Sequence, residues 1–90
     1  MIKVRIPAQL RTLTGGSGEV SVEGSTVGEA LKALDAAHAG FADRIFDEAG
    51  GLRRFVNVFL DDEDVRFLEG LATPIAAGQT LSIVPAVAGG

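Results

Sequence analysis

The sequence contains one long amphipathic helical segment among several segments with strand patterns. Residues 27–38 repeat apolar side chains at spacings of three and four, which is typical of a helix with one buried face. Strand patterns, with alternating or β-branched residues, occur at 2–6, 19–23, 55–60, 65–67 and 81–84. A single helix covers one face of one sheet, and 90 residues have room for one core. The pattern therefore predicts a two-layer α+β domain.

The first two strand segments are predicted to form an antiparallel hairpin. In residues 2–6 the apolar side chains point to one face and the two cations to the other. Residues 19–23 alternate in the same way, with glutamates at both ends. Gly15–Gly18 between them supplies the positive φ angles that a reversal needs.

The start of the helix has a capping box. Thr26 is followed three residues later by Glu29, so each side chain can satisfy a free backbone N–H of the first turn. The buried face is expected to include Ala37 and to reach His38 in the last turn, where the imidazole has a structural role. Gly28 costs about 1 kcal/mol relative to Ala in a helix, which indicates that another backbone packs closely there.

The second half of the chain carries shorter elements. The core face of residues 55–60 is expected to hold Val56, Val58 and Leu60. In order, we expect a short helical turn at 41–46, a strand at 55–60, a charged turn at 61–64, a short strand at 65–67 and a last strand at 81–84 ended by Pro85.

Composition excludes several function classes. The chain has no cysteine and one histidine, so it lacks the residues for a disulfide framework, a thiolate metal site or a multi-histidine zinc site, and we expect no bound metal. A formal net charge of −4 disfavours binding to nucleic acid. No apolar run approaches the ~20 residues of a membrane span, and the N-terminus is unlike an export signal. We expect a cytoplasmic protein that binds neither nucleic acid nor membranes.

Two charged groups have both a structural and a functional interpretation. The run Asp61–Asp64 is either a solvated turn or a docking patch for a partner. Arg53–Arg54 is either a solvated pair or a contact for an acidic partner. No base and nucleophile are paired in the sequence, so we expect no catalytic residues and no enzyme activity.

The end of the chain carries the chemistry. Pro85 stops strand pairing, so residues 86–90 are predicted to form a free arm of about 16 to 18 Å when extended. The arm ends in Gly89 and Gly90, which have no side chains to obstruct a narrow channel. A terminal carboxyl is ionised at neutral pH and is a poor electrophile. It therefore needs activation by a partner enzyme.

Several motifs point to a known family. They are Arg11-x-x-Thr14-Gly15-Gly16, Thr26-x-Gly28, Arg54-Phe55-Val56-Asn57-Val58, Asp62-Glu63-Asp64-Val65-Arg66-Phe67, Gly70-Leu71-Ala72-Thr73 and the ending Pro85-Ala86-Val87-Ala88-Gly89-Gly90. With them, the chain resembles the ThiS/MoaD family of ubiquitin-like sulfur carriers, and within it the CysO-like branch. The resemblance implies a β-grasp fold over residues 1–85, with a mixed sheet of about five strands and one main helix across one face. It also implies a flexible tail at 86–90.

The resemblance implies a carrier whose active group is Gly90. An adenylyltransferase of the ubiquitin-activating type would adenylate the carboxyl, and sulfide from a sulfurtransferase would convert it to a thiocarboxylate. Val87, Ala88 and Gly89 would thread into the partner. The lack of cysteine agrees with this chemistry, because the chain can then hold transferable sulfur only through its terminal acyl group.

The implied acceptor is a pyridoxal-phosphate cysteine synthase that uses O-phosphoserine, followed by a metalloprotease that trims the adduct. ATP, pyridoxal phosphate and zinc would belong to these partners, and the carrier would bind no cofactor itself. Three alternatives stay open: the small subunit of molybdopterin synthase, a carrier shared by thiosugar or thiazole pathways, and a ubiquitin-like protein modifier. We expect a monomer when the carrier is free.

A partner surface is predicted on the solvent side of the sheet near the tail. Phe59 alternates away from the core, and an exposed aromatic residue suits an interface. Arg66 and Phe67 are predicted to join it.

Overall fold

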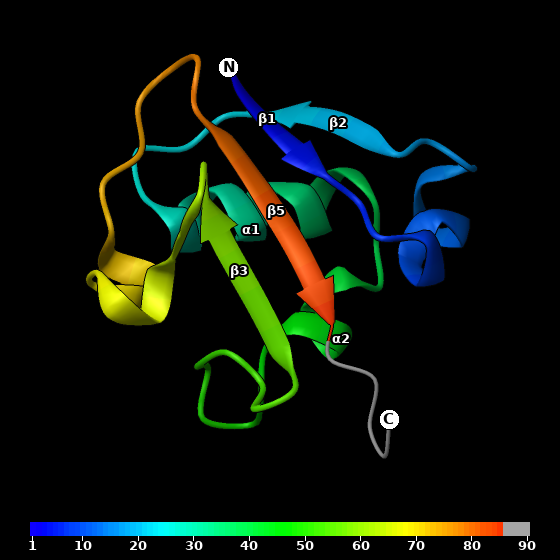
Figure 1. The fold of residues 1–90 in the computed structure, drawn as a ribbon. Helices are drawn as coiled ribbons and strands as arrows, with labels where there is room; N and C mark the ends of the chain where they lie inside the picture. Colours follow the sequence, from blue (N-terminus) through cyan, green and yellow to red (C-terminus); the bar gives the residue numbers. More distant parts are fainter. Residues whose placement is uncertain (86–90) are drawn as a thin grey trace.

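The computed structural model describes residues 1–85. They form one mixed five-stranded sheet in the order β2-β1-β5-β3-β4, with the main helix α1 across one face (Figure 1). β5 lies in the centre, parallel to β1 and antiparallel to β3. The bounds are β1 Ile2–Arg5, β2 Glu19–Val22, α1 Val27–Ala37, α2 Phe41–Ile45, β3 Val56–Leu60, β4 Glu63–Asp64 and β5 Thr80–Pro85. This arrangement confirms the predicted β-grasp fold.

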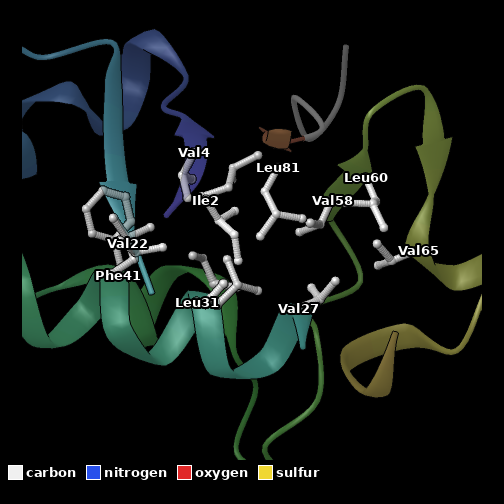
Figure 2. Packing of buried hydrophobic residues seen from close by; sticks show 14 of the residues in the cluster. Ile2, Val4, Val22, Val27, Leu31, Phe41, Val58, Leu60, Val65 and Leu81 are labelled. Atoms are coloured by element: carbon white, nitrogen blue, oxygen red, sulfur yellow. The ribbon is translucent and has the colours of Figure 1, made fainter. Parts of the chain in front are cut away.

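The core lies between α1 and the sheet. Figure 2 shows side chains of β1, β3 and β5 directed toward the helix, where Leu31 is fully buried. Leu31→Ala in such a site costs about 2 to 5 kcal/mol. The predicted alternation is confirmed in β3, because Val56, Val58 and Leu60 are buried.

The first two strands pair antiparallel as predicted. Arg5 lies opposite Glu19, and Lys3 Nζ lies 3.8 Å from a carboxylate oxygen of Glu19. Their connection contains a 3₁₀ helix at Ala8–Thr14, an element that the sequence pattern did not predict. The reversal follows at Gly15, with φ of 67°, where glycine avoids the strain of a side chain.

The start of α1 confirms the predicted cap at Thr26, and the Glu29 carboxylate reaches back as predicted, to the residue before the N-cap. The Glu29 N–H donates to Thr26 Oγ1 over 3.2 Å, and the Glu29 carboxylate accepts from the Ser25 N–H over 2.9 Å. Gly28 lies against the 3₁₀ helix Gly70–Ala72, since a Cβ atom at Gly28 would stand 3.1 Å from the Leu71 carbonyl oxygen. The predicted close approach of another backbone is therefore present.

The end of α1 differs from the prediction. The helix ends at Ala37, which is exposed, and His38 is a half-buried C-cap outside helical geometry. The prediction that Ala37 joins the buried face was wrong, because the chain leaves the helix at this point, and the buried face of the last turn ends with Leu34.

The region after β3 also differs. The predicted strand at Val65–Phe67 is a 3₁₀ helix, because the Asp64 carboxylate accepts from the Arg66 N–H over 2.9 Å and caps that turn. Part of the predicted charged turn is instead the short strand β4, and the turn itself is Asp61 and Asp62. Asp61 has φ of 56°, a left-handed conformation that Asp adopts more readily than most residues.

The last strand is longer than predicted. It begins at Thr80 and includes Pro85, which lies opposite Val56 of β3. Proline has no N–H to donate to a strand ladder, and here it stands at the end of the strand.

No helix within residues 1–85 has the length and apolar character needed to cross a membrane. The predicted free tail at 86–90 lies outside the described residues.

Candidate functional site

The candidate site lies around the end of β5, where the C-terminal tail begins. Val87, Ala88, Gly89 and Gly90 lie outside the described residues, so their predicted roles stay predictions. The described chain ends at Pro85, at one end of the central strand. Pairing with β1 on one side and β3 on the other holds β5 in place. The point from which the last five residues start is therefore set by the sheet.

One face of the sheet points away from α1 and carries the predicted partner surface. Opposite residues of an antiparallel pair share a face, and the register places Asn57 opposite Val84 and Phe59 opposite Ser82. Val84 is 44% exposed. We call these residues of β3 and β5 the open face.

Phe59 occupies this face but is less accessible than predicted. It is half-buried, because it has paired neighbours on both sides, Asp64 of β4 and Ser82 of β5. Phe59 was predicted to be exposed, and its ring is only partly accessible. Phe67, in the neighbouring 3₁₀ helix Val65–Phe67, is 87% exposed. Its ring contributes little to the core and is free to contact a partner.

Arg66 lies beside the open face and has contacts inside the chain. Its Nη1 donates to Asn57 Oδ1 over 2.8 Å, and its Nη2 donates to the Arg53 carbonyl oxygen over 2.7 Å. The guanidinium thus joins the 3₁₀ helix to the start of β3. Arg66 is still an exposed residue, but its two hydrogen bonds hold the 3₁₀ helix Val65–Phe67 beside the start of β3.

Sequence reasoning missed two exposed apolar residues near the end of β5. Phe55 is 56% exposed and directly precedes Val56, the residue opposite Pro85. Val84 is the other. The signal for Val84 was available, because Leu81 and Ile83 are the buried partners in the alternation of β5.

The acidic turn has a role in the fold. The carboxylate of Asp61 accepts from the Thr80 N–H over 3.1 Å and from Gln79 Nε2 over 3.1 Å. These bonds tie the turn after β3 to the start of β5. Residues 1–85 include no group of three or more His, Cys, Asp or Glu side chains placed to hold a metal ion.

Three proteins with similar sequences and structures indicate the family of this chain. The sulfur carrier protein CysO of Mycobacterium tuberculosis is 48% identical over 91 residues, which cover 99% of this chain and 98% of that protein. A chain in the crystal structure of the Amycolatopsis orientalis BexX/CysO complex matches with a TM-score of 0.94 and 47% identity, over 100% of both chains. The small archaeal modifier protein 1 of Haloferax volcanii matches with a TM-score of 0.77 and 34% identity, over 96% of this chain and 97% of that one.

The family itself is shown by the extent of the match. The model of the ThiS family matches residues 4–90, which include the whole sheet except the first residues of β1 and also the Gly-Gly end. The match therefore includes α1 and all five strands apart from the first two residues of β1. The chain therefore belongs to the ThiS family of ubiquitin-like sulfur carriers.

Proposed function

We propose that this chain carries sulfur as a thiocarboxylate on its C-terminal residue, Gly90. The observation that supports this most is the similarity to the sulfur carrier CysO, which extends over 99% of the chain. A central strand that ends at Pro85, five residues before Gly90, agrees with this proposal. With no cysteine in the chain, the terminal acyl group is the one place where transferable sulfur can be held.

The proposed chemistry has two steps. An adenylyltransferase of the ubiquitin-activating type joins the Gly90 carboxylate to the AMP part of ATP and releases pyrophosphate. Sulfide, supplied by a sulfurtransferase or another donor, then attacks the acyl carbon and displaces AMP. The carboxyl oxygen leaves with AMP, and Gly90 keeps the sulfur.

The proposed acceptor is a pyridoxal-phosphate cysteine synthase that uses O-phosphoserine, and a metalloprotease then trims the carrier–cysteine adduct. ATP, pyridoxal phosphate and zinc act in these partners, and the carrier supplies no cofactor site of its own. A location in the cytoplasm fits the need for ATP. We also propose that the chain is a carrier without catalytic activity and a monomer when free.

Intact-mass measurement tests the proposal. The chain is incubated with ATP, sulfide and the activating enzyme of the same organism, and we expect the mass gain of one oxygen-for-sulfur exchange, localised to Gly90 by fragmentation. Omission of ATP should abolish the gain. An unchanged mass with an enzyme that is active on another carrier would overturn the proposal.

A second function, covalent protein modification, is favoured by the similarity to the small archaeal modifier protein 1. Gly90 would then form an isopeptide bond with a lysine of a target protein. Tryptic digestion of cell protein and a search for lysines that carry residues 67–90 of this chain, the fragment that follows its last tryptic site at Arg66, separate this function from sulfur transfer.

Two further assignments of the acceptor remain distinguishable by genetics. A small subunit of molybdopterin synthase should co-purify with a large subunit, and its deletion should remove the molybdenum cofactor. A carrier shared with thiosugar or thiazole pathways should cause several sulfur-dependent defects at once when deleted.

A further inference from the structure

A cationic hollow lies beside the end of β5. Its volume is about 440 Å³, and its lining includes Arg44 from α2, Arg53 and Arg54 from the segment before β3, and the last described residue, Pro85. Phe55 also lines it and is 56% exposed. The hollow thus combines three guanidinium groups with an accessible aromatic ring.

The positive charge of this hollow is little offset within the described chain. Among residues 1–85, no carboxylate forms an ion pair with any of the three guanidinium groups. One carboxylate, that of Asp47, also lines the hollow. Its Oδ1 accepts from the N–H groups of Ala49 and Gly51, both over 3.0 Å, so it is held in its own loop. Arg53 is positioned by donation from its Nε to the Asp43 carbonyl oxygen over 2.9 Å.

The charge of the hollow is opposite to that of the whole protein. The chain has a formal net charge of −4, whereas the lining has three cations and one anion. Two oppositely charged surfaces attract each other before contact, so a local patch of this kind selects and orients a partner of the other sign.

The hollow lies close to the start of the tail, and this position indicates which partner contacts it. Gly90 is the fifth residue after Pro85, so the Gly90 carboxyl lies at most about 18 Å from the edge of the hollow. An enzyme that acts on this carboxyl must therefore approach the surface around Pro85. Phe55 offers it an apolar contact, and the arginines offer it ionic ones.

We propose that this hollow receives an acidic segment of the enzyme that adenylates Gly90, with Arg44 and Arg54 as its ionic contacts. The proposal rests on the proposed function and adds to it a second recognition site, on the folded domain and not on the tail. Its contacts are charge-assisted hydrogen bonds from guanidinium to carboxylate, and they guide the tail toward the active site of the partner.

Charge reversal tests this site. Arg54→Glu and Arg44→Glu, each made separately, should raise the KM of the carrier in adenylation about tenfold with little change in kcat, because electrostatic steering changes encounter more than chemistry. Lys32→Glu is the matched control, since Lys32 is an exposed cation on α1 and not part of the hollow. Arg54→Lys keeps the charge and should restore most of the affinity. Thermal unfolding of each variant shows that it is folded.

Salt supplies a second readout. The KM of the unmodified chain should rise steeply with sodium chloride, and the KM of Arg54→Glu should rise less.

Each outcome decides the proposal. Equal KM values for Arg54→Glu and Lys32→Glu would overturn it, although Gly90 would still be adenylated and the proposed function would stand. A lower KM for Arg54→Glu would also overturn it, because the hollow would then hold the chain's own terminal carboxylate. Failure of the proposed function is a different result, namely no adenylation of the unmodified chain.

Discussion

Arg66 and Asn57 are joined across the edge of the sheet by a hydrogen bond of 2.8 Å from Nη1 to Oδ1. β4 covers only the far end of β3, where Phe59 and Leu60 pair with it. Arg66 occupies the edge next to the other end, and its second bond reaches the Arg53 carbonyl oxygen. The side chain thus bridges a side chain of β3 and the segment before that strand, and it links the partner surface to the cationic hollow.

Arg66→Ala should lower the free energy of unfolding by about 0.5 to 1.5 kcal/mol, because two hydrogen bonds are lost at an exposed site. Chemical denaturation measures the loss. Lys32→Ala, which removes an exposed cation on α1, is the control and should change the free energy less. A double-mutant cycle with Asn57→Ala should show coupling. Additive effects of the two substitutions would contradict the proposed link.

Phe67→Ala should leave the stability unchanged within about 0.5 kcal/mol, since the side chain is 87% exposed. If Phe67 contacts the activating enzyme, the KM of the carrier should nevertheless rise about tenfold, as for a truncated interface residue. Steady-state adenylation kinetics give the KM. An unchanged KM would remove Phe67 from the partner surface.

Phe59 needs a different substitution. Phe59→Asp would place a carboxylate opposite Asp64, and like charges across a strand pair are destabilising. Phe59→Thr keeps β propensity and avoids this repulsion. We expect it to raise the KM for adenylation while thermal unfolding shows a folded domain. A KM equal to that of the unmodified chain would show that Phe59 does not contact the activating enzyme.

Gly28→Ala should fail to give the stabilisation of about 1 kcal/mol that Ala gives over Gly in an exposed helix. The added Cβ would lie 3.1 Å from the Leu71 carbonyl oxygen and 3.2 Å from Leu71 Cβ. Chemical denaturation is the measurement, and Gly28→Val should be clearly less stable than either. A gain of about 1 kcal/mol for Gly28→Ala would show that the 3₁₀ helix Gly70–Ala72 moves away readily.

Deletion of Gly89 and Gly90 should abolish sulfur loading while the free energy of unfolding changes by less than about 0.5 kcal/mol. These residues follow the last pair of the sheet, Val56 with Pro85, so the described core does not depend on them. Intact mass and denaturation provide the two readouts. If the shortened chain still carried sulfur, the role of Gly90 would be contradicted. If it bound its partner as tightly as the full chain but carried no sulfur, the folded domain would act as a docking module.

Much of the fold could be predicted from the sequence because its signals are local. The alternation of residues 2–6 and the capping box of Thr26 and Glu29 depend on neighbours within one strand or one helical turn. The same is true of the Gly-Gly end, since the chemistry of a terminal carboxyl without side chains belongs to those residues alone.

The tertiary structure decided what lies next to the end of the chain. Strand pairing puts β5 between β1 and β3, so that Pro85 comes opposite Val56 and beside the arginines of two other segments. Likewise, Arg66 meets Asn57 nine positions away, and a cap at Asp64 turns the predicted strand 65–67 into a 3₁₀ helix. Contacts between distant segments depend on the order of strands in the sheet, and no local pattern of residues encodes that order.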